Sequence, residues 1–301
     1  MNKILQIGCI LCWGVLLVQA KPLLVTGSSN HRAHEIGEVA AFSTLRVNGQ
    51  IEVDVQQGAT DEYAVSLYGP DNLIDWVQIS SQGGVLAIQY KQPLVITGDQ
   101  HLHVLVTTPT LTDLHVQEKG EVRFVGAFQT TELNVIANGK IEIDIEDLQA
   151  QSVRVEAKGE AEVDMIKLDC QSLHVETDQQ ASFEVQQTVC PSLMLLAENR
   201  SDMEVSSLTG QHVSAQSNHA ANIELKGKTE QASLIARGHS SIQAGSLQAD
   251  KAEVMAANGS YIDVRVSGTL TAQTDSRGVV QYRGWPREIN RSGKGLVRKN
   301  S

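Results

Sequence analysis

The chain has 301 residues, of which 41% are hydrophobic and only 4% aromatic, and its 24 basic and 35 acidic residues give a net charge of −11. So acidic a protein repels polyanions, which argues against a nucleic-acid partner and against an anionic membrane surface. After the first twenty residues no stretch approaches the roughly 18 consecutive apolar residues of a spanning helix, so we expect no integral membrane segment in the mature chain.

Residues 1–20 have the features of a secretory signal peptide: Lys3 precedes an apolar core, and Val18-Gln19-Ala20 forms a small-residue cleavage site. We therefore predict an exported protein, located in the periplasm, at the outer surface or secreted. Its removal leaves 23 basic and 35 acidic residues, a net charge of −12. Residues 21–41 carry Ser, Asn, His and Gly without periodicity, which predicts a flexible leader.

From residue 42 to 110 the sequence predicts irregular strands. Short alternating runs are broken by Gly69-Pro70, Gly83-Gly84 and Pro109, as expected of an N-terminal β capping region. The string from Val47 to Val55 nearly matches the string from Ala137 to Ile145, which indicates that both parts of the chain use one building unit.

Residues 111–286 repeat at a step of twenty. Each unit holds two alternating apolar runs separated by a Gly- and Asn-rich pair such as Asn138-Gly139, which predicts two half-buried strands and a corner. The units are too short for crossover helices. We therefore predict an all-β parallel β-helix (β-solenoid) of nine coils of about 20 residues. Antiparallel hairpins are the alternative, but they would not require the same apolar positions to recur every twenty residues. The two recurring phases are Leu133, Val153, Leu173, Leu193 and Val213, then Ile143, Val163, Phe183, Met203 and Ile223.

The regular pattern stops after Tyr282. Trp285 and Pro286 then suggest a lid, because an open coil end exposes strand backbone. Residues 287–301 form a basic C-terminal tail.

In successive units, the same outward position of the second run holds an acidic residue, so these residues form a column along the stack. Like charges on adjacent rungs disfavour each other by up to about 1 kcal/mol, so a compensating cation is expected. Arg123 shares the phase and could neutralise Asp144 only. The column predicts either a Ca²⁺ site or a surface for a basic partner, and the alternative is a solvated polar face. Its members are Asp144, Asp164, Glu184, Glu204 and Glu224.

Cys170 and Cys190 are the only cysteines outside the signal peptide, and they lie one repeat apart. Their Cα atoms should be about 4.8 Å apart on adjacent coils, within the window of a disulfide. We predict that export allows this disulfide to form, with two half-buried free thiols as the alternative.

No catalytic motif is found. The nine histidines share no repeat phase, and His101 and His103, which could bind a metal from one strand face, more simply form a surface pair. We therefore predict no enzyme activity, and no cofactor apart from the possible Ca²⁺.

Three segments are typical of a known family: Phe42-Ser-Thr-Leu-Arg-Val-Asn-Gly49, the motif of Tyr282, Gly284 and Pro286, and Ser292-Gly-Lys-Gly295. They resemble the putative auto-transporter adhesin, head GIN domain family, whose function is unknown. The resemblance implies a single head GIN-like domain over residues 42–286 and an adhesion-type role. The Gly-Ser-Gly corners of the family are here reduced to pairs such as Lys158-Gly159.

Three functions from different classes follow. The favoured one is an exported non-enzymatic binding or adhesion surface in the cell envelope, with an unknown envelope, glycan or protein partner. A self-assembling structural envelope element and a polysaccharide-active β-helix enzyme are the alternatives.

Overall fold

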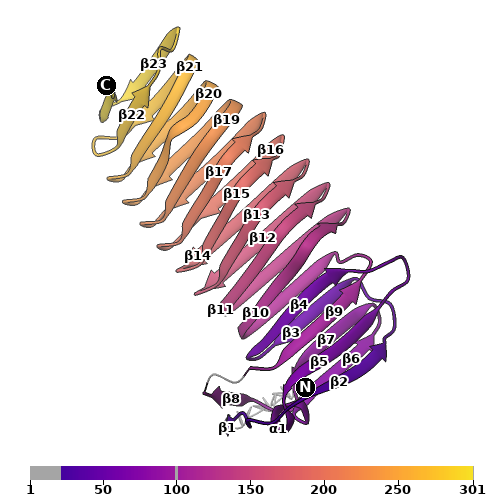
Figure 1. The fold of residues 1–301 in the computed structure, drawn as a ribbon. Coiled ribbons are helices and arrows are strands. Elements are labelled where there is room, and N and C mark those ends of the chain that lie inside the picture. The colour runs from indigo at the N-terminus through magenta and orange to yellow at the C-terminus, as the bar shows by residue number, and fades with distance from the viewer. Residues whose placement is uncertain (1–21, 99–100, 301) are drawn as a thin grey trace, which may run out of the picture.

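The computed structural model describes residues 22–98 and 101–300. It is nearly all β, with 73% strand and 1% helix, and it forms a β-solenoid of about nine turns (Figure 1). This confirms the predicted fold class. The expected signal peptide, residues 1–20, lies outside the described residues, and within them no helix is both long enough and apolar enough to cross a membrane.

The regular coils stack as parallel strands in the predicted register. Leu133 pairs with Val153 and Val153 with Leu173, a step of twenty residues in each case. The strands are β10 (Asp113–Gln129), β11 (Glu132–Gln149), β12 (Ser152–Gly159), β13 (Glu162–Asp169), β14 (Ser172–Gln179), β15 (Ser182–Val189), β16 (Ser192–Ala197), β17 (Asp202–Thr209), β18 (His212–Asn218), β19 (Asn222–Arg237), β20 (Ser241–Ala257), β21 (Tyr261–Thr274) and β22 (Val279–Arg283).

Both recurring apolar phases point inward. Leu133, Ile143 and Phe183 are at most 1% exposed, and the alternating residues between them face outward. Because each coil exposes one apolar face to its two neighbours, stacking alone builds a continuous core.

The corners between the two runs follow the Gly- and Asn-rich column. Gly139, Gln179, Asn199, His219 and Gly238 all have positive φ. At Gly139 an added Cβ would also collide with the carbonyl group of Glu118 in the coil below, so this corner requires glycine.

The N-terminal region caps the stack, and its coils are not stacked in chain order. β3 pairs with both β7 and β10, and β4 with both β9 and β10, so the coil of β3 and β4 lies between the β7–β9 coil and β10. Val53 pairs with Val122 and Val122 with Ile143, which explains why the two distant strings match. The elements are β3 (Thr44–Asn48), β4 (Ile51–Gln57), β5 (Ala64–Pro70), α1 (Asp71–Ile74), β6 (Val77–Gln82), β7 (Val85–Tyr90), β8 (Leu94–Thr97) and β9 (His103–Thr108).

Both ends of the chain are more regular than predicted. In place of a flexible leader, β1 (Leu23–Thr26) pairs with β8, and β2 (His31–Glu38) pairs antiparallel with β5. In place of an unpatterned basic tail, β23 (Glu288–Gly293) and β24 (Leu296–Lys299) add strands to β21 and β22. Trp285 is not a lid, since its residue is 84% exposed and the chain continues into another coil.

Candidate functional site: an acidic face

The second runs of the coils bring two outward columns of carboxylates together on one surface, which we call the acidic face. The predicted column is in register: Asp144 pairs with Asp164, Asp164 with Glu184, Glu184 with Glu204 and Glu204 with Glu224. A second column, two residues earlier in each strand, holds Glu52, Glu121, Glu142 and Glu162. Adjacent members of either column are one strand spacing apart, about 4.8 Å between backbones.

Cations neutralise the two ends of this face. Arg123 does not pair with Asp144 as predicted: its Nε lies 2.9 Å from Asp54 and 3.4 Å from Glu121, on the side of the preceding coil. At the other end the Nζ of Lys226 lies 2.6 Å from Glu204 and 2.8 Å from Glu224. Sequence reasoning missed Lys226, although it follows Glu224 by two residues and therefore shares its face.

The middle of the face holds five carboxylates for which the described residues supply no ion pair. At Asp164 and Glu142, partial burial and the proximity of like charges favour the protonated form. Burial, then Glu162, Glu184, Asp144 and Glu142, raise the pKa of Asp164 from 3.8 to about 6. Burial and the neighbouring carboxylates, Asp144 first, also raise the pKa of Glu142. The five are Glu142, Asp144, Glu162, Asp164 and Glu184.

Lys226 reverses this effect at Glu204. Its hydrogen bond, together with one from the hydroxyl of Ser206, lowers the pKa of the Glu204 carboxyl. The pKa shifts of Asp164 and Glu204 thus have opposite directions, with burial the largest cause at Asp164 and the hydrogen bond from Lys226 the largest cause at Glu204.

Two shallow hollows run along the acidic face. One, of about 200 Å³, extends from Gln50 and His101 across Lys119 and Lys140 to Glu162. The other, of about 430 Å³, runs from Glu162 past Glu184 to Gln243. Because Glu162 lines both, the hollows form one continuous shallow track over the unneutralised carboxylates.

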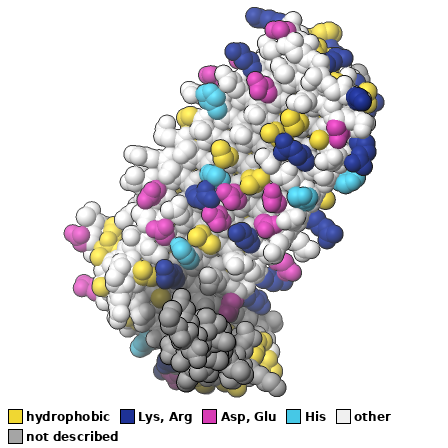
Figure 2. Space-filling view, turned by 180° about the vertical axis from the view of Figure 1, so that it is seen from behind, with side chains coloured by type: hydrophobic (Ala, Val, Ile, Leu, Met, Phe, Trp, Pro, Cys, Tyr) yellow, Lys and Arg dark blue, Asp and Glu magenta, His cyan; other side chains and the backbone are white. Residues whose placement is uncertain are grey.

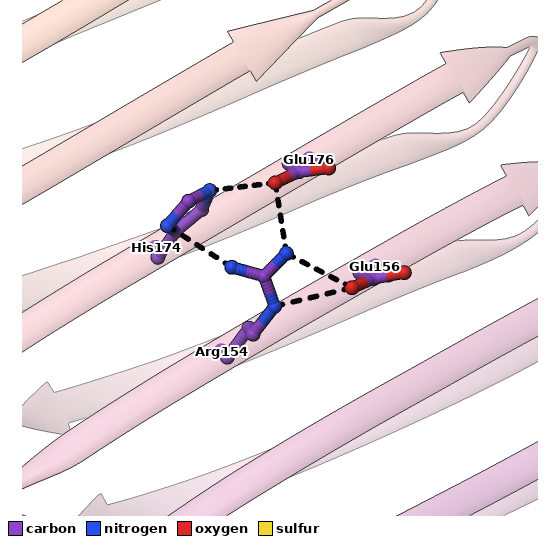
Figure 3. Close-up of polar contacts among 4 residues, drawn as sticks. All are labelled: Arg154, Glu156, His174 and Glu176. Carbon is purple, nitrogen blue, oxygen red and sulfur yellow. Dashed lines mark hydrogen bonds and ion pairs between the residues drawn. The ribbon is translucent and has the colours of Figure 1, made fainter.

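The first runs of the coils carry acids too, but there they are neutralised internally (Figure 3). Arg154 donates to Glu156 and to Glu176, each at 2.9 Å, and His174 lies 2.8 Å from Glu176 through Nε2 and 3.2 Å from Arg154 through Nδ1. The two glutamates are paired rungs. On this surface a cation bridges acids on adjacent rungs, as Lys226 does for Glu204 and Glu224 on the acidic face. The five central carboxylates of the acidic face have no such ion pair among the described residues.

The histidine pair and the calcium site are not brought together as a metal centre. The Nδ1 atoms of His101 and His103 lie 3.4 and 3.0 Å from the two carboxylate oxygens of Glu52. In the part of the chain that the structure describes, no group of three or more His, Cys, Asp or Glu side chains could hold a metal ion. The carboxylates of the column are thus spread along the stack rather than gathered around one point.

Cys170 and Cys190 occupy the same corner of adjacent coils, as predicted. Both are buried free thiols, and their Sγ atoms are 3.0 Å apart. Their shared hydrogen bond and their burial raise the pKa of the Cys170 thiol. The disulfide itself remains a prediction.

The C-terminal family motif has a structural role. Tyr282 is buried in the last part of the core, and Gly284 turns the chain out of β22 with a φ of 87°. A Cβ at Gly284 would lie 2.5 Å from the carbonyl oxygen of Val266, so only glycine fits. Pro286 follows directly and leads the chain into the next coil.

Comparison with known proteins places this fold in a family. The chain is similar in structure to a putative adhesin from Parabacteroides distasonis (16% identity, TM-score 0.51, covering 92% of this chain and 100% of that one). It is equally similar to a putative adhesin from Parabacteroides merdae (15% identity, TM-score 0.51, covering 92% and 99%). These likenesses show the fold alone, and no curated protein matches the chain. The family model described as putative auto-transporter adhesin, head GIN domain, matches residues 41–188 and 171–286. The chain therefore belongs to the putative auto-transporter adhesin, head GIN domain family.

Proposed function

We propose that the protein is an exported, non-enzymatic binding protein of the cell envelope, and that the acidic face is its adhesive surface. The observation that carries the proposal is the run of carboxylates from Glu142 to Glu184, none of which forms an ion pair with another described residue. A cationic partner would relieve the repulsion among these neighbouring carboxylates. The family and its adhesin-named neighbours support an adhesion-like role, and export would place the surface in the envelope.

The shape of the face favours an extended partner over a compact one. The two hollows are shallow and continuous, and the carboxylates repeat at the strand spacing of about 4.8 Å. A linear molecule with regularly spaced amines, such as a lysine-rich peptide segment or an amino-sugar polymer, could contact several rungs at once. Contacts to several rungs add avidity without any single deep pocket.

The test is a binding titration with pentalysine and with a glucosamine oligomer at low and high salt. A variant carrying Glu142→Gln, Asp164→Asn and Glu184→Gln removes three charges from the face. A matched control removes three exposed charges elsewhere, through Glu132→Gln, Asp169→Asn and Glu230→Gln. Three lost surface contacts of about 0.5 kcal/mol each predict an affinity about ten-fold lower for the face variant, and little change for the control. Equal losses in both variants would reduce the effect to net charge and refute the proposed face.

Glycan hydrolysis is a second candidate, favoured by one observation. Asp164, whose pKa is raised, lies beside other carboxyl groups, and a glycosidase places its general acid beside a second carboxyl group in the same way. Side chains on adjacent rungs start from backbones about 4.8 Å apart, so two carboxyl groups there can adopt the separation of roughly 5–5.5 Å that retaining glycosidases use. Release of reducing ends from an amino-sugar polymer, abolished by Asp164→Asn, would establish this activity; binding without release supports the adhesive function.

A further inference from the structure

Charge is unevenly distributed along the solenoid. Residues 276–300 contain seven basic residues and one acidic residue, a net charge of +6 within a chain whose total is −11. In Figure 2 these dark blue side chains gather at the upper, C-terminal end. Residues 22–43 and 58–98, at the opposite end of the stack (Figure 1), contain six acidic and two basic residues. The two ends of the molecule are therefore oppositely charged.

The basic end presents open strand edges. Among the described strands, β23 pairs only with β21, and β24 only with β22, so the backbone groups on their outer sides have no partner there. Arg291 and Lys299 hold positions in register with the buried Ala272 and Tyr282, where earlier coils have apolar side chains. Arg291 lies over the ring of Tyr282, and Lys299 over the ring of Trp285. Cationic side chains thus close the core and surround the two open edges.

The acidic end presents open edges too. Within residues 22–98 and 101–300, β2 pairs only with β5 and β6 only with β7. All eight residues of β2 are exposed, and the strand is held by backbone pairing on one side, by the ion pair of Arg32 with Asp75 and by stacking of His31 on Tyr68. Large apolar side chains are exposed at both ends, with Leu24 at 68% and Tyr68 at 55% on the acidic end and Trp285 at 84% on the basic end. An unprotected edge with apolar neighbours is a template for strand addition.

We propose that the protein associates end to end with a second copy of itself, the basic edge of β23 and β24 docking against the open edge of β2 and β6 at the acidic end. Charge selects this orientation, because joining two basic ends or two acidic ends would oppose like charges. A contact between different surfaces at opposite ends of a straight stack does not close on itself, so repetition gives an open filament. The acidic face lies along the side of the solenoid and stays accessible in such a filament, which makes this association independent of the proposed binding function.

The test uses charge exchange between the two ends, on protein expressed from the full-length sequence. One variant carries Arg287→Glu and Arg298→Glu at the basic end, and the other carries Glu35→Lys and Glu38→Lys on β2. Arg291 and Lys299 are left intact because they cover the core. A control variant with Lys158→Glu and Lys228→Glu makes the same change of charge as the first variant, but on the side of the solenoid.

Sedimentation velocity at low salt should show wild type and control growing in mass with concentration, and high salt should reverse the growth. Each end variant alone should associate more weakly than wild type, because one variant lowers the charge of the basic end from +6 to +2 and the other neutralises the acidic end, from −4 to 0. Mixing the two end variants should restore one unaltered contact, between the acidic end of the first variant and the basic end of the second, and should therefore give heterodimers; no other surface predicts this rescue. A monomeric wild type at all concentrations, or no rescue on mixing, would overturn the proposal. Co-sedimentation with anionic phospholipid vesicles that depends on Arg287 and Arg298, without self-association, would overturn it in favour of a membrane-binding end.

Discussion

Replacing Asp164 by asparagine should stabilise the protein at neutral pH. The pKa of this carboxyl is raised from 3.8 to about 6, chiefly by burial and then by the neighbouring carboxylates. One pKa unit corresponds to about 1.4 kcal/mol, so the ionised group costs at most about 3 kcal/mol. Asp164 is only partly buried, and solvent screening reduces the expected gain to about 1 kcal/mol.

The sign of the pH dependence follows from the direction of the shift. A pKa raised in the folded state means that folded Asp164 holds its proton more tightly than the unfolded chain does. Its contribution to stability is therefore present below pH 3.8 and is lost as pH rises through about 6. Wild type should gain stability from this group on acidification from pH 7.5 to pH 4.5, and Asp164→Asn should not show that part of the gain.

Urea unfolding of both proteins at these two pH values measures the difference. The matched control is Glu204→Gln, since Lys226 lowers the pKa of Glu204; its contribution is present above the unfolded value and lost as pH falls. The control should therefore be destabilised at pH 7.5. The reasoning is refuted if Asp164→Asn destabilises the protein at pH 7.5, or if both substitutions act in the same direction.

Three further predictions follow from the coil register and the site. Ile143→Asp places a charge in a fully buried position and should destabilise the fold by several kcal/mol, measured by thermal melting; a melting temperature equal to that of wild type would contradict the register. If Ca²⁺ binds the column, millimolar Ca²⁺ should raise the melting temperature, and Glu184→Gln with Glu204→Gln should abolish the rise; a calcium-independent melt of wild type leaves a cationic partner as the ligand. Thiol counting on denatured, unreduced protein should find no free thiol at Cys170 and Cys190, whereas two per chain would refute the disulfide, which should contribute about 3 kcal/mol.

The coils could be predicted because a fixed step places equivalent residues on adjacent rungs. Once Leu133 and Val153 share a phase, so do Asp144 and Asp164, and the acidic column follows from counting alone. The neutralising cations were harder to predict. Arg123 has a carboxylate in phase on either side, Asp54 and Asp144, and only the stacking order of the N-terminal coils shows that Asp54 is its neighbour.

The two ends were missed for a different reason. β2 has no buried face, so its sequence lacks apolar alternation, and its pairing with β5 depends on backbone hydrogen bonds. In the last coil, Arg291 and Lys299 hold inward positions, which hides the alternation that marks the earlier coils. A hydrophobic pattern reveals strands that bury side chains, and the end strands of a solenoid bury few.

The most direct measurement follows the titration of Asp164 by carbon NMR of its carboxyl group, with and without pentalysine. The account holds that this carboxylate lacks a cation until a partner supplies one. It predicts a midpoint near pH 6 in the free protein and a lower midpoint in the complex, because an adjacent opposite charge favours ionisation. A midpoint near 3.8 in the free protein, or one that pentalysine leaves unchanged at saturating concentration, would contradict the claim that the acidic face is an unneutralised binding surface.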